Sequence, residues 1–194
     1  MSMPISITDA LNHLDILREF IDNDIPAAIN GNANYLAALG LLAYTEYMGG
    51  LYCGNLTTDL SIHYITFIKK FFPYDYAKVE VDLRSNHLRG LYSVVRSGLT
   101  HEYFIKEISK IEMNNPSGQP LSCGIAYNKT SNPQIVFYVN QYFNDFKGAF
   151  EQYYDQLKYD TTGSMLKNFE KALRSINSSL ICKLPKDFRR DVSG

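Results

Sequence analysis

The sequence is poor in the features that mark several classes of protein. Its 194 residues include only three cysteines and no CxxC pair, so neither a zinc knuckle nor a disulfide framework is expected. The 19 basic residues are balanced by 20 acidic ones, which gives a net charge of −1. General nucleic-acid binders carry a basic excess that attracts phosphates. Any nucleic acid bound by this chain must therefore meet a local site and not a broad basic surface.

Long apolar runs are also missing. No stretch approaches the ~18 apolar residues of a membrane span. The first residues, MSMPISITDALNHLDIL, lack the basic start and the continuous apolar stretch of a signal peptide. We therefore expect a cytoplasmic protein that does not engage a membrane. No set of cysteines, histidines or carboxylates has the spacing of metal ligands, so neither a metal ion nor another cofactor is expected.

Apolar residues recur mostly at helical spacing, which predicts a mainly α fold. Pro26 is expected to begin a second helix, which the 30–34 segment kinks and the Gly49-Gly50 pair weakens or ends. The remaining helices are expected over 59–72, from about 81 to Arg96, after Asn140, and around 166–176.

A change of pattern separates the last two helices from the others. Between about 107 and 139 apolar residues alternate and turn residues interrupt them, which predicts a three-stranded antiparallel β-meander. The whole chain, 1–194, is thus expected to form a single domain. It would be a helical bundle with a small sheet inserted before the last two helices and a loose tail over about 178–194.

Arg96 and His101 carry the most definite chemistry in the sequence. They are five residues apart, which on an unbroken helix separates them by about 140°. Gly98 lies between them and can break the helix, so that both side chains meet in one pocket. A guanidinium binds phosphate oxygens bidentately, and an imidazole exchanges a proton near neutral pH. In RNA the 2′-hydroxyl supplies the nucleophile, so no metal or protein nucleophile is needed. The spacing alone favours a structural role, a helix-end cap and a salt bridge to Glu102.

The segment around these two residues, LYSVVRSGLTHEYF over 91–104, resembles the Arg-x(4–6)-His signature of the HEPN superfamily. The resemblance implies a bundle of four or five helices and a metal-independent endoribonuclease of a toxin or defence type. It also implies a homodimer in which two motifs face one composite cleft, with an antitoxin as a further partner. By position, Arg96 and His101 match the catalytic pair, and Ser97 matches the polar position that follows the arginine.

Two further residues are candidates for supporting roles. Glu46, shortly before Gly49-Gly50, can orient His101 or pair with Arg96, or else be an exposed helical glutamate. Tyr103 can stack on a base or belong to the core. Some HEPN-like proteins bind without cutting. The alternatives are therefore a non-catalytic module that binds a nucleotide, RNA or a partner protein, and a purely structural helical protein.

Overall fold

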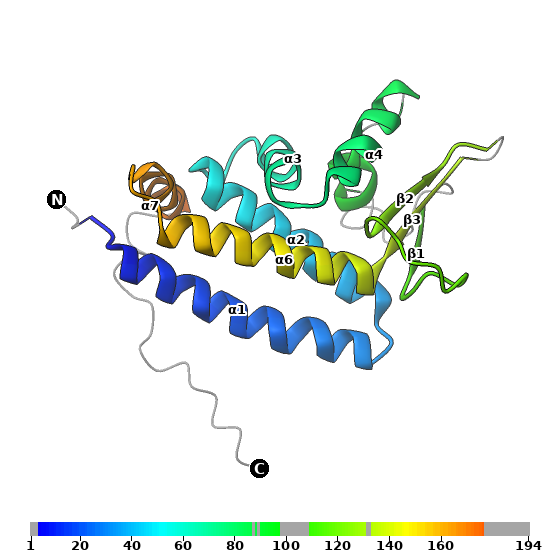
Figure 1. Ribbon diagram of the computed structural model, residues 1–194, viewed down its shortest axis with the longest axis horizontal. Coiled ribbons are helices and arrows are strands. Elements are labelled where there is room, and N and C mark those ends of the chain that lie inside the picture. The colour runs from blue at the N-terminus through cyan, green and yellow to red at the C-terminus, as the bar shows by residue number, and fades with distance from the viewer. Residues whose placement is uncertain (1–3, 87, 89, 98–108, 131–132, 177–194) are drawn as a thin grey trace, which may run out of the picture.

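A computed structural model of the chain describes residues 4–86, 88, 90–97, 109–130 and 133–176. These residues form helices and one small sheet, as expected for a mainly α fold (Figure 1). The helical elements are α1 (Ile7–Asn30), α2 (Asn34–Cys53), α3 (Leu60–Phe71), α4 (Tyr74–Ser85), η1 (Tyr92–Ser97), α6 (Val139–Lys158) and α7 (Ser164–Ile176). The strands are β1 (Ser109–Glu112), β2 (Ile125–Asn128) and β3 (Gln134–Tyr138).

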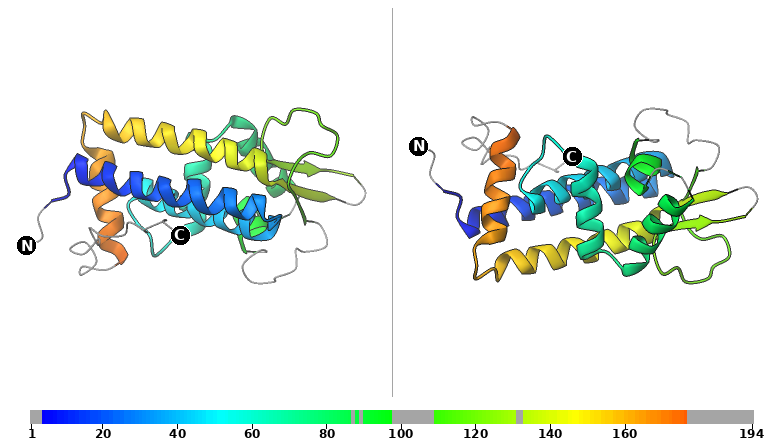
Figure 2. Two further views of the ribbon diagram at one scale, coloured as in Figure 1. Left: turned by 90° about the horizontal axis from the view of Figure 1, so that it is seen from below. Right: turned by 90° about the horizontal axis from the view of Figure 1, so that it is seen from above.

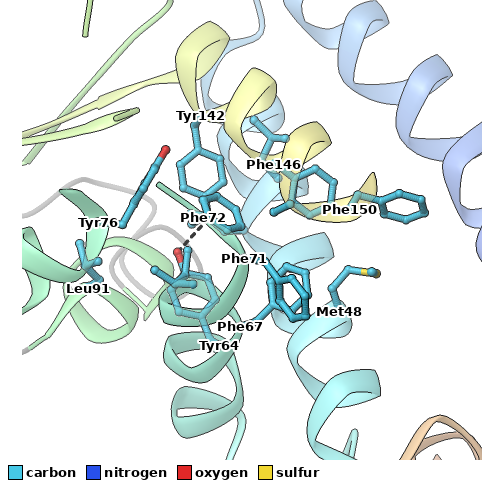
Figure 3. Close-up of a cluster of buried hydrophobic side chains, with 14 of the residues drawn as sticks. Met48, Tyr64, Phe67, Phe71, Phe72, Tyr76, Leu91, Tyr142, Phe146 and Phe150 are labelled. Carbon is cyan, nitrogen blue, oxygen red and sulfur yellow. Dashed lines mark hydrogen bonds between the residues drawn. The ribbon is translucent and has the colours of Figure 1, made fainter. Parts of the chain in front are cut away.

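Three long helices form the body of the protein. α1, α2 and α6 pack against one another in pairs, and α7 crosses one end of the bundle against α2 and α1 (Figure 2). At the other end lie α4 and the sheet, with α3 between α2 and α4 (Figure 1). Fully buried aromatic rings fill the space between α3 and α6, among them Phe67, Tyr142 and Phe146 (Figure 3). Such rings bury large apolar areas and dominate core energetics.

Pro26 does not begin a helix, contrary to the expectation from the sequence. α1 continues through it to Asn30, because Ile21 and Ile25 extend the buried stripe of the helix and hold this turn against the core. The proline removes only the hydrogen bond to the carbonyl of Asp22, an exposed residue whose carbonyl water can satisfy. The helix instead ends at Asn30, before Asn32 adopts a left-handed conformation with φ of 55°.

The Gly49-Gly50 pair does not end α2 either. Both glycines lie inside the helix, which stops at Cys53 before the left-handed Gly54. A Cβ at Gly49 would lie 2.5 Å from the carbonyl oxygen of His63, so the backbones of α2 and α3 are in direct contact there. Gly49 therefore allows a close helix crossing in place of a helix end. A Cβ at Gly50 would lie 2.5 Å from the side chain of Leu56, in the segment that follows α2.

The single helix expected from about 81 to Arg96 is two elements. α4 begins at Tyr74, directly after Pro73, and ends at Ser85. A separate helical turn, η1, then carries Arg96. Pro73 is the N-cap residue of α4, a position where its missing N–H removes no hydrogen bond of the helix. α3, over Leu60–Phe71, agrees closely with the predicted helix, and α7 agrees with the last one.

The sheet is present between the predicted limits, but its order is not that of a meander. β3 lies in the centre, with β1 parallel to it on one side and β2 antiparallel on the other. β2 and β3 pair antiparallel and are separated by only five residues in the chain. The longer 113–124 segment carries the chain from β1 at one edge of the sheet to β2 at the other. This segment ends at Gly124, whose N–H donates to the hydroxyl of Tyr76 at 2.8 Å. A Cβ there would overlap the backbone of Tyr142, so the segment lies directly on α4 and α6.

Candidate functional site

Arg96 lies in a helical turn of unusual geometry. η1 is a π-helical segment over Tyr92–Ser97, and Arg96 and Ser97 are its last two residues. Single π-turns are rare and recur at functional sites. Leu91, Val94 and Val95 are all buried and hold the turn against the core. η1 packs against α3 and α2, the helix that carries Glu46.

A chain of aromatic and hydroxyl contacts ties the start of η1 to the bundle. The ring of Tyr92 meets the ring of Tyr64 edge-on, with centroids 5.5 Å apart. The hydroxyl of Tyr64 lies 3.0 Å from that of Tyr142 on α6 (Figure 3). Tyr142 in turn lies 3.0 Å from the hydroxyl of Thr45, which donates to the carbonyl of Leu41. Thr45, Tyr64 and Tyr142 are fully buried and Tyr92 is half-buried, so these contacts couple the position of η1 to α2, α3 and α6 together.

Glu46 is half-buried in the structure and not an exposed helical glutamate. It follows Thr45 and precedes Gly49 by three residues, so it lies on the stripe of α2 that meets α3. α2 also contacts η1, the element that carries Arg96. The supporting role of Glu46 stays a prediction.

His63 adds a polar group at the same junction. Only 9% of the residue is exposed, and its Nδ1 is a buried atom without a hydrogen-bond partner among the residues that the structure describes. Its backbone touches Gly49, and its neighbour Tyr64 touches Tyr92. No motif in the sequence marks it. Nearby, a buried carboxylate that was also missed, Glu80, accepts a hydrogen bond from the backbone of Leu91 just before η1.

The structure places part of the predicted site and not the rest. For Arg96 and Ser97 it gives the course of the backbone in η1. Gly98, His101, Glu102 and Tyr103 lie outside the described residues, so the meeting of Arg96 with His101 stays a prediction. The loose tail expected over about 178–194 also lies outside the described residues.

The described part of the chain holds neither a cluster of metal ligands nor a membrane-spanning helix. No three histidine, cysteine, aspartate or glutamate side chains gather there as ligands of a metal ion would. None of the helices there has the length and apolar character needed to cross a bilayer.

Comparison with known proteins gives no relative: no family model, curated protein or solved structure matches this chain.

Proposed function

We propose that the protein is a HEPN-type endoribonuclease that cuts RNA without a metal ion, using Arg96 and His101. The proposal rests first on the motif in the sequence and on a mainly helical fold of the kind the motif implies. The structural observation that carries it is the π-helical turn bearing Arg96, which packs at the junction of α2 and α3.

The chemistry follows from the two side chains. The 2′-hydroxyl of the substrate attacks the adjacent phosphorus, and the bond to the 5′-oxygen of the next nucleotide breaks. His101 takes the proton from the 2′-oxygen or delivers one to the leaving 5′-oxygen. Arg96 stabilises the negative charge that gathers on the phosphate oxygens. The products are a 2′,3′-cyclic phosphate and a 5′-hydroxyl end, and the cyclic phosphate can open to a 3′-phosphate.

Supporting groups are at hand for the arginine. Glu46 lies on α2, which contacts η1, and we propose that its half-buried carboxylate orients a guanidinium or an imidazole. Ser97 directly follows Arg96, and we propose that it binds the phosphate, with Tyr103 stacking on a base. A second copy of the chain would complete the cleft by bringing a second Arg96 and His101 to it.

The small net charge bears on how the substrate is held. At −1, the chain offers little general attraction for RNA, so binding must come from the local site. A local site of this kind also suits the second candidate function, a module that binds a nucleotide, an RNA end or an antitoxin without cutting.

The test is cleavage of mixed cellular RNA in EDTA. Purified wild-type protein is compared with His101→Ala, Arg96→Ala and, as a surface control, Lys129→Ala, whose side chain is half exposed in an ion pair with Asp82. Melting curves confirm that all four are folded. The proposal predicts cutting by the wild type and by Lys129→Ala only. If none of the four cuts, while labelled RNA binds in an Arg96-dependent way, the binding-module function is correct instead.

A further inference from the structure

The buried carboxylate of Glu80 lies at the start of the helical turn that carries Arg96. Glu80 is on α4 and only 2% exposed. Its Oε2 accepts a hydrogen bond from the backbone N–H of Leu91 at 2.6 Å. Its Oε1 accepts one from the Nε of Arg84 at 2.5 Å, one helical turn further along α4. Both oxygens of this buried acid are thus engaged, one by a surface side chain and one by the backbone that leads into η1.

The neighbouring residue shows how closely the two segments fit. A Cβ at Gly90 would lie 2.5 and 2.7 Å from the two carboxylate oxygens of Glu80 and 2.9 Å from the guanidinium of Arg84. No other amino acid can occupy this position without moving the carboxylate. The chain therefore passes directly over Glu80 immediately before the turn begins.

The first N–H groups of any helical turn lack partners within the helix, and a carboxylate placed there both accepts a hydrogen bond and complements the helix dipole. In η1 this cap comes from α4 and not from the residues just before the turn. The turn itself is short, with only Tyr92–Ser97 in π-helical geometry, so few hydrogen bonds of its own fix its direction. Its orientation must come from the buried side chains on one side and the Glu80 contact at its start.

From these contacts we infer that Glu80 is a positioning residue: through the N–H of Leu91 it sets the place of the π-helical turn and hence of Arg96. The inference rests on the proposed function for its catalytic consequence. Its structural part, control of the turn by Glu80, stands by itself. Arg84 has a different role, because its side chain is 66% exposed and balances the charge of Glu80 without touching η1 in the described contacts.

Three variants separate these roles. Glu80→Ala removes the acceptor, Glu80→Gln keeps a carbonyl oxygen that can accept from Leu91, and Arg84→Met removes the counter-charge but leaves the cap. On RNA in EDTA, we expect Glu80→Ala to lower kcat by about 10- to 100-fold with little change in KM, since small misplacements of a catalytic group have effects of this size. Glu80→Gln should restore kcat to within about threefold of the wild type. Arg84→Met should lose thermal stability and keep its kcat.

Amide hydrogen exchange measures the local stability of the turn directly, whether or not the protein cuts RNA. Exchange at Val94–Ser97 should quicken by about tenfold in Glu80→Ala and not in Glu80→Gln, with the amides of α6 unchanged in both. Unaltered exchange in Glu80→Ala would overturn the inference. So would a loss of kcat that follows melting temperature equally in Glu80→Ala and Arg84→Met. Altered exchange in a protein that never cuts RNA would keep the role of Glu80 and refute the nuclease function alone.

Discussion

The hydroxyl groups of Tyr64 and Tyr142 lie 3.0 Å apart in the core, although 78 residues separate them in the chain. Tyr64 also contacts Tyr92, at the start of the turn that carries Arg96. The polar contact therefore connects the candidate site with α6. Burial raises the pKa of the Tyr142 hydroxyl, so this group stays protonated and can donate a hydrogen bond throughout the physiological range.

Tyr142→Phe should lower the free energy of unfolding by about 1–2 kcal/mol, because it removes the hydroxyl that both Tyr64 and Thr45 contact. Tyr159→Phe is the matched control, because Tyr159 is 70% exposed. Loss of its hydroxyl should change the free energy of unfolding by less than about 0.5 kcal/mol. Urea denaturation of the two variants measures the difference. Equal effects would show that the buried hydroxyl network does not contribute to stability.

Gly49→Ala should destabilise the protein by about 1–3 kcal/mol, since the new methyl group would press on the backbone of His63 and force α2 and α3 apart. Gly148→Ala makes the same chemical change on an exposed face of α6, where a Cβ would have no neighbour within 4 Å. There alanine should stabilise the helix by about 0.5–1 kcal/mol. Thermal melts of both variants give the comparison. A stabilising Gly49→Ala would mean that the two helices do not cross as closely as described.

The stability of the protein should fall in mild acid through His13. The Nε2 atom of His13 shares a hydrogen bond with the Tyr47 hydroxyl, 2.8 Å away, and its ring meets the Phe169 ring edge-on. Burial lowers the pKa of His13 below its usual 6.5. Below pH 6.5 the unfolded chain therefore binds more protons at this site than the folded one, and the free energy of unfolding decreases as the pH falls.

The contribution of His13 is isolated by comparing wild type with His13→Gln between pH 7.5 and pH 5. The other three histidines are the same in both proteins, so the difference between the stabilities of the two proteins reports His13. The wild type should lose its advantage over the variant as the pH falls. A difference that stays constant over this range would show that His13 takes up its proton as readily in the folded protein as in the unfolded chain.

Helical periodicity was sufficient to predict much of the fold. α3 and α7 occur where apolar residues repeat every three or four positions, because such a stripe can be buried only by a helix. The errors arose where tertiary packing overrode local preference. Pro26 remains inside α1 because Ile21 and Ile25 keep the helix on the core, and Gly49 serves a helix crossing that no local pattern reveals.

The sheet and the site show a different limit. The pattern of alternation indicates a strand but not its neighbour, so the parallel pairing of β1 with β3 could not be foreseen. The motif indicated Arg96 as a candidate site residue, because the residues of the motif lie close together in the sequence. Glu80 and His63 approach the site only through the fold, and a single acid or histidine within a helix has no spacing that would mark it.

The most direct measurement is an analysis of the RNA ends formed in EDTA. A defined RNA is incubated with the wild type beside the same sequence with 2′-deoxyribose throughout, and the products are identified by mass spectrometry. The proposed mechanism predicts 2′,3′-cyclic phosphate and 5′-hydroxyl ends from the RNA. It predicts no cutting of the deoxy strand, because the 2′-hydroxyl is the nucleophile. Cutting of the deoxy strand, or 5′-phosphate ends that appear only when Mg²⁺ is added, would contradict metal-free catalysis by Arg96 and His101.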